Sequence, residues 1–210
     1  MKYTNRQSHG NDFENRVHLA EHGRTKEEYE KLIPNGYTAE LDLVSGVEVD
    51  FNGSVKTTCQ NSVDCGSIKR MYENTKNKNI KIIIGEHREI DTNTKSFDKI
   101  YVFDYNKLHF PLLWANQKLD TLQAMVDYVV NVPFGRKGQK DNQKLWKQKR
   151  EEIYKSEGKG LMTINVKIDG KKQRRIQCGF KIKELIEAGI PYKVYTKKYK
   201  NIDLPYVYTK

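Results

Sequence analysis

The stretch GVEVDFNGSVKTT, residues 46–58, decides the fold expected for this chain. An acidic β-like run leads into Asn52-Gly53, a dipeptide typical of tight turns between antiparallel strands. A second β-like run follows and carries Lys56 among small hydroxyl residues. The pattern therefore predicts a β-hairpin with acidic side chains on one strand and a lysine on the other.

The elements expected on either side of this stretch set the fold class. Helical spacing of apolar residues and a Thr25/Glu28 capping-box pattern predict two helices before it. Three β-like runs are expected next, at residues 39–44, 47–51 and 54–58, separated by Ser45-Gly46 and Asn52-Gly53. A helix, two strands and another helix are expected after them. The predicted helices are residues 11–22, 25–33, 64–74, 119–130, 145–155 and 180–188, and the predicted strands after residue 58 are 80–85, 100–105, 161–168 and 173–178. This order predicts an α/β (α+β) core with a mixed central sheet flanked by helices.

Positive charge is concentrated in the last third of the chain. The 210 residues carry a formal net charge of +11, and residues 136–200 hold 20 Lys/Arg against 7 Asp/Glu. Aromatic side chains are interleaved with these charges. A near-neutral body with one basic region indicates a nucleic-acid partner. A lysine-rich composition that only decorates solvated surfaces remains the alternative.

The predicted hairpin contains the groups that metal-dependent phosphodiester hydrolysis requires. Carboxylates hold Mg²⁺, which lowers the pKa of a bound water. A nearby cation stabilises the negative charge that develops on the phosphate. The hairpin offers Asp50 and Lys56 for these two tasks, while a half-buried structural strand is the alternative interpretation.

From the GNDFENRV helix to about residue 105, the chain resembles the PD-(D/E)XK nuclease superfamily, which includes many type II restriction enzymes. On that resemblance Asp50 is the metal-binding aspartate and Lys56 the motif lysine. Ser54 takes the place usually held by Asp or Glu, and Glu14 matches a helix glutamate that some members use as an additional ligand. The resemblance implies a restriction-endonuclease-like core, a Mg²⁺ cofactor, double-stranded DNA as substrate and a homodimer.

The short spacing between Asp50 and Lys56 leaves other metal ligands open. In a flat two-residue hairpin these two side chains would point to opposite faces. A bulge or strong twist would correct this, or Asp42 on the preceding run is the aspartate. Because Ser54 cannot replace a carboxylate, Glu48 and Glu73 are further candidates.

Contacts with DNA are expected from the basic region. Two β-like runs flank Asp169-Gly170, and side chains on this second hairpin are candidates for phosphate contacts and base readout in the major groove. The candidates are Lys171, Lys172, Gln173, Arg174, Arg175 and Gln177. The chain is treated as one nuclease domain over residues 1–210, with a catalytic core at 1–134 and a DNA-binding flank at 135–210.

The remaining sequence features argue against a disulfide-rich protein, a zinc-binding protein and a membrane protein. Three cysteines give neither a disulfide framework nor a zinc quartet, and the five histidines show no metal-ligand spacing. The chain contains no apolar run of about 18 residues and no signal-peptide pattern, so we expect a cytoplasmic protein without a membrane partner.

The function that we expect is therefore a Mg²⁺-dependent, sequence-specific endonuclease of the type II restriction kind. A non-catalytic nucleic-acid-binding protein and a structure-specific nuclease, such as a junction resolvase, are the alternatives.

Overall fold

The computed structural model describes residues 8–33, 41–131, 136–168 and 174–210, with side chains described for all of these except 136–144. The chain divides into two compact units built from non-contiguous segments. Unit 1 comprises residues 1–63, 78–106 and 189–210, and unit 2 comprises 64–77 and 107–188. The prediction of a single domain with a boundary at 134/135 stays a prediction.

Unit 1 contains two short helices and a five-stranded mixed sheet. The strands follow the order β1-β3-β4-β10, and β7 also pairs with β4. Strand β1 runs parallel to β3, and the other pairs are antiparallel. The bounds are α1 (Ser8–His22), α2 (Lys26–Glu30), β1 (Asn52–Thr58), β3 (Ile80–Glu89), β4 (Thr94–Tyr105), β7 (Tyr192–Tyr195) and β10 (Tyr206–Thr209), with β8 (Lys198–Tyr199) and β9 (Ile202–Asp203) forming a separate pair.

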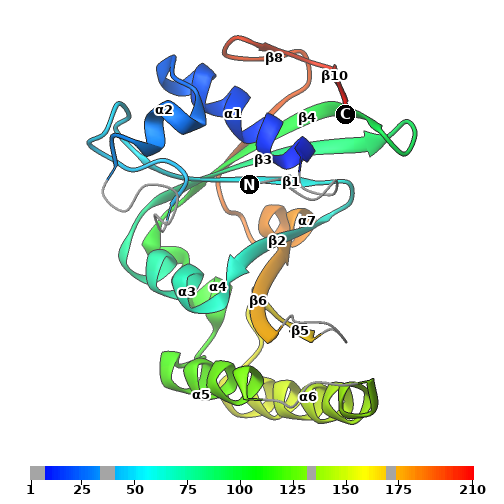
Figure 1. Ribbon diagram of the computed structural model, residues 1–210. Coiled ribbons are helices and arrows are strands. Elements are labelled where there is room, and N and C mark those ends of the chain that lie inside the picture. The colour runs from blue at the N-terminus through cyan, green and yellow to red at the C-terminus, as the bar shows by residue number, and fades with distance from the viewer. Residues whose placement is uncertain (1–7, 34–40, 132–135, 169–173) are drawn as a thin grey trace. The chain divides into compact units, whose positions relative to one another are not determined.

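Helix α1 covers one face of this sheet (Figure 1). Phe13 and Val17, the apolar stripe expected from the sequence, are fully buried against β-strand residues such as Ile83. Gly85 permits the close approach, because a Cβ there would lie 2.8 Å from a ring carbon of Phe13. The packing fixes α1, and therefore the side chains on its flank, relative to β1.

Unit 2 contains most of a three-stranded sheet of order β2-β6-β5, together with helices. Strand β2 begins in unit 1, at Ser62, and crosses into unit 2 at Asp64. The bounds are β2 (Ser62–Ser67), α3 (Ile68–Asn77), α4 (Phe110–Trp114), α5 (Leu119–Val130), α6 (Arg136–Glu157), β5 (Thr163–Ile168), β6 (Arg174–Lys181) and α7 (Ile182–Glu187). None of the described helices is long and apolar enough to cross a membrane.

The predicted fold class is confirmed at the level of a mixed α+β protein with a central mixed sheet flanked by helices. The prediction of a tight turn at Asn52-Gly53 is wrong. Both residues lie inside β1, where Gly53 pairs with Leu43 through hydrogen bonds of 3.0 and 2.8 Å. Pairing of β1 with both neighbours outweighs the local turn preference of Asn-Gly.

The reversal instead occurs at residues 45–49. It includes the Ser45-Gly46 break expected between the first two β-like runs, and it extends into residues 47–51, which the sequence predicted as a strand. Gly46 and Glu48 adopt positive φ angles of 86° and 59°. The Gly46 amide donates to the Val49 carbonyl at 2.9 Å. The acidic segment is therefore a turn that connects residues 41–45 to β1.

Candidate active site

Asp42 and Lys56 meet at the edge of the unit 1 sheet. The antiparallel pairing of Leu43 with Gly53 places Asp42 opposite Ser54 on β1. The Asp42 Oδ2 atom accepts hydrogen bonds from the Val55 amide at 2.6 Å, the Lys56 ammonium at 3.0 Å and the Ser54 hydroxyl at 3.3 Å. Asp42 therefore stands beside the Ser-x-Lys segment, in the position that the sequence analysis left open for it.

These contacts keep the Asp42 carboxylate charged. Burial raises the pKa of Asp42, but Lys56 and the Val55 amide outweigh burial and hold the pKa below its usual value. The side chains remain 27% and 22% exposed for Asp42 and Lys56, respectively. The pair is thus ionised and still reachable from solvent.

Glu14 from α1 supplies a second carboxylate to the same site. Its pKa is raised to about 7, first by burial and next by the negative charge of Asp42, while Lys26 and Lys56 oppose the shift. The structure therefore brings Asp42, Ser54 and Lys56 into contact, and the charges of Asp42 and Lys56 act on the neighbouring Glu14.

Lys26 is the site residue that the sequence analysis missed. Its ammonium lies 2.9 Å from Glu14 Oε2 and 3.8 Å from Glu30 Oε1. Burial lowers the pKa of Lys26, but Glu14 outweighs burial and the pKa is raised overall. No motif marks this lysine among the 38 Lys and Arg residues; only its place just after the Thr25 cap distinguishes it.

Two neighbouring histidines on α1 complete the surroundings of the site. The His18 Nδ1 and His22 Nε2 atoms lie 3.0 Å apart. Burial, followed by His22, lowers the pKa of His18 to about 4, while Asp42 opposes the shift. Both rings contact Tyr29, so packing accounts for their positions.

The other predicted ligands lie elsewhere. Asp50 is exposed in the segment after the turn and lines a cavity of about 810 Å³ together with Glu48 and Lys81. The Glu48 carboxylate lies 3.2 Å from the Arg24 guanidinium. Glu73 lies on α3 in unit 2, so its predicted role stays a prediction.

The predicted DNA-contacting residues are described only in part. Arg174, Arg175 and Gln177 lie on β6 in unit 2. Lys171, Lys172 and Gln173 lie outside the described residues. Unit 2 as a whole holds 21 Lys/Arg and 11 Asp/Glu, a net charge of +10, whereas unit 1 holds 17 and 16. The positive charge thus belongs to one structural unit.

The donor set of the candidate site fits a hydrated divalent cation. Within the described ranges, no three His, Cys, Asp or Glu residues are grouped to hold a metal ion. Mg²⁺ sites commonly use one or two carboxylates and fill the remaining positions with water and substrate phosphate. Burial and, next, the charge of Asp42 raise the pKa of Glu14, and a bound cation would offset both effects.

No family model, no curated protein and no solved structure matches this chain.

Proposed function

We propose that this protein is a Mg²⁺-dependent endonuclease that cleaves double-stranded DNA at specific sequences, in the manner of a type II restriction enzyme. The observation that carries the proposal is the 3.0 Å ion pair between Asp42 and Lys56 at the sheet edge. The carboxylate of Glu14 is close enough for the charge of Asp42 to help raise its pKa. The concentration of positive charge in unit 2 supports a polyanionic substrate.

Each side chain has a distinct task in this proposal. Asp42 and Glu14 hold the cation, and a bound Mg²⁺ lowers the pKa of water and offsets phosphate charge. Lys56 donates hydrogen bonds to the attacking water or to the phosphate oxygen on which negative charge develops. Lys26 holds the Glu14 carboxylate in place through the 2.9 Å ion pair. Asp42 takes the role that the resemblance assigned to Asp50.

The proposal also keeps the homodimer that the resemblance implied. A two-fold symmetric dimer recognises a palindrome because each copy contacts one half-site in the same way. Sedimentation of the protein with and without a cleavable duplex measures the number of copies in the complex.

The deciding experiment is a digest of plasmid and phage DNA by the purified protein, with Mg²⁺ and with EDTA. We expect discrete fragments only with Mg²⁺, and no fragments from the Lys56→Ala variant. Lys99→Ala is the matched control, because Lys99 is a half-buried lysine that likewise pairs with a carboxylate, Glu86, at 3.2 Å.

Other outcomes separate the alternatives. DNA that is shifted in a gel but uncut under every condition would leave a non-catalytic binding protein. Cleavage of four-way junctions but not of linear duplex would identify a structure-specific nuclease. Binding that does not weaken as the salt concentration rises would contradict a nucleic-acid partner, because contacts to phosphates depend on salt.

A further inference from the structure

The three-stranded sheet β2-β6-β5 has two chemically different faces. Cross-strand partners in an antiparallel pair project to the same face, and successive residues alternate between faces. The β5–β6 register pairs Asn165 with Gln177 and Lys167 with Arg175. These four side chains, two amides and two cations, therefore share one face, which we call the polar sheet face.

The opposite face is anchored in the core of unit 2. Its cross-strand pair Ile164 and Cys178 is fully buried, and Ile176 is 4% exposed. The Ile164 amide donates to the Tyr154 hydroxyl of α6 at 2.9 Å. Arg174 pairs with Ile168 and so belongs to this apolar side, although it neighbours Arg175 in the sequence.

The polar sheet face is accessible and carries few internal contacts. Arg175 is exposed, and Asn165, Lys167 and Gln177 are half-buried. Among the described residues, these four side chains make one ion pair, between Lys167 and Asp64 at 3.6 Å. The Lys167 side chain is 41% exposed and the Asp64 side chain 56%. The amides and the Arg175 guanidinium thus keep their hydrogen-bonding capacity for a ligand.

We infer that the polar sheet face reads base edges in the major groove of duplex DNA, with Asn165, Lys167, Arg175 and Gln177 as the residues that determine sequence preference. The inference rests on the DNA substrate of the proposed function. Arg and Lys pair with guanine in the major groove, and Asn and Gln pair with adenine.

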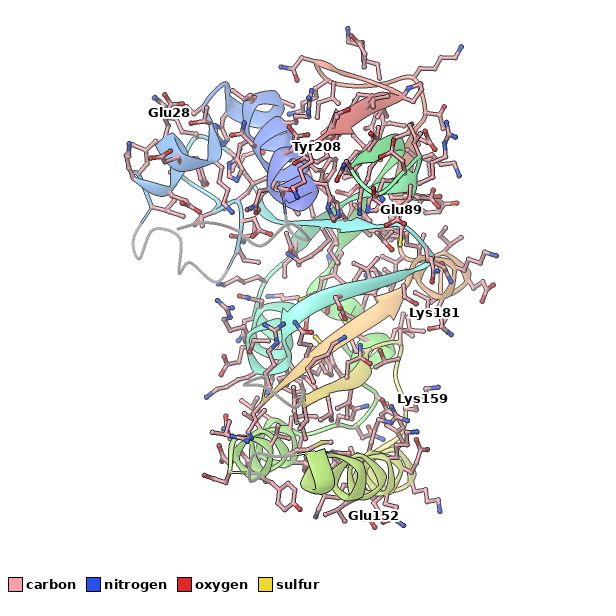
Figure 2. The ribbon with its side chains drawn as sticks, turned by 45° about the vertical axis from the view of Figure 1, so that its right-hand side comes forward. Glu28, Glu89, Glu152, Lys159, Lys181 and Tyr208 are labelled. Carbon is pink, nitrogen blue, oxygen red and sulfur yellow. The ribbon has the colours of Figure 1, made fainter. Side chains whose placement is uncertain are left out.

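The geometry and charge suit this partner. The major groove accommodates a two-stranded β-ribbon. Side chains two residues apart on a strand are about 6.8 Å apart, which is close to two base-pair steps of about 3.4 Å each. Figure 2 shows the three strands side by side in the order β2-β6-β5. Lys167 on β5 pairs with Asp64 on β2 at 3.6 Å, so a duplex that docks on this face would compete with Asp64 for the Lys167 ammonium.

The test is selection from a duplex library with a randomised centre, carried out in EDTA so that bound DNA is not cut. The wild-type protein should enrich a defined sequence. Gln177→Ala and Asn165→Ala should each reduce the preference for that sequence over random duplex by about 5- to 150-fold, while binding to random duplex changes less than 3-fold. Lys118→Gln, which changes an exposed lysine just before α5 and outside the basic region, should retain the preference.

Salt dependence separates cation contacts to bases from contacts to phosphates. Arg175→Gln should change which base is enriched at one position while the salt slope stays within about 0.3 of the wild-type value, because loss of one phosphate contact would lower the slope by about 0.9. A lowered slope with unchanged preference would place Arg175 on the backbone and overturn its role in readout.

The inference and the proposed function can fail separately. Sequence-selective binding that depends on Gln177, from a protein that never cuts, would support the inference and refute the nuclease. Site-specific cutting that is unchanged in all of these variants would support the nuclease and refute the inference. Tighter binding to duplex RNA than to duplex DNA would overturn the inference, since side chains cannot enter the narrow major groove of A-form RNA. Circular dichroism melts of each variant verify that the fold is retained.

Discussion

The ammonium of Lys56 lies 3.0 Å from the carboxylate of Asp42, although 14 positions separate the two residues in the sequence. The contact exists because residues 41–45 pair with the start of β1 through Leu43 and Gly53. A hairpin closed at Asn52-Gly53 would instead have paired Asp50 with Val55. The path of the chain through the acidic turn therefore selects which aspartate meets the lysine.

Asp42→Asn and Asp50→Asn distinguish the two aspartates by activity. We expect Asp42→Asn to lower the Mg²⁺-dependent cleavage rate by about 100-fold or more, the usual cost of removing a group that stabilises transition-state charge. Asp50→Asn should retain a rate within about 3-fold of wild type. Single-turnover cleavage of an end-labelled duplex measures both, and the opposite ranking of the two variants would assign the metal to Asp50.

Glu14→Gln should stabilise the metal-free protein at alkaline pH. The pKa of Glu14 is raised to about 7 in the folded state against a usual value of 4.5. Its stabilising contribution is therefore complete below pH 4.5 and is lost as pH rises through 7. Urea unfolding in EDTA should show a gain on the order of 1–3 kcal/mol for the variant at pH 8 and little gain at pH 4.5. Equal stability of the two proteins at pH 8 would contradict the shift.

His87 should make the fold sensitive to acid. It is 4% exposed, its Nδ1 atom has no hydrogen-bond partner among the described residues, and its ring packs against His9 and Phe97. Burial, followed by the charge of Lys95 and by His9, lowers the pKa of His87 to about 4, while Glu89 opposes the shift.

Because the unfolded chain binds this proton near pH 6.5, stability is complete above pH 6.5 and falls toward pH 4. The loss is up to about 1.4 kcal/mol per pH unit for this group. His87→Leu should reduce the slope of unfolding free energy against pH over this interval. An unchanged slope would mean that His87 does not contribute.

Tyr29→Phe should loosen the acidic turn. The buried Tyr29 hydroxyl accepts from the Val44 amide at 2.8 Å and contacts the carbonyl oxygens of Val47 at 3.1 Å and Val44 at 3.3 Å. Loss of the hydroxyl leaves the Val44 amide without this partner, so we expect a cost of about 1–3 kcal/mol. Chemical denaturation measures the cost, and faster hydrogen exchange at Val44 would locate it. Val63→Ala, in a buried position away from the turn, should destabilise without increasing exchange at Val44.

Much of the fold was predictable where local periodicity and burial agree. The stripe of Phe13 and Val17 predicted α1, the Thr25 cap predicted α2, and the apolar runs predicted β3 and β4. Residues 62–67 gave no such signal, because Ser, Cys and Gly dominate β2, and the structure forms a strand where part of a helix was expected.

The candidate site was predictable in its residue types but not in its pairing. Glu14, Ser54 and Lys56 carried the resemblance, and Asp42 was the stated alternative to Asp50. The choice between the aspartates depended on contacts between β1 and its two neighbours, which a tight-turn preference cannot encode. Lys26 was not predictable, because its contact with Glu14 arises from the packing of α2 beside α1.

The interleaving of the two units constrains how the protein is made on the ribosome. Unit 2 ends at Ala188, whereas the unit 1 sheet still requires β7 and β10 from residues 192–209. Unit 2 therefore has its complete chain while the sheet that holds Lys56 lacks two strands. The sheet that holds Lys56 can therefore close only after residues 192–209 have been synthesised, so the candidate site is completed among the last steps of folding.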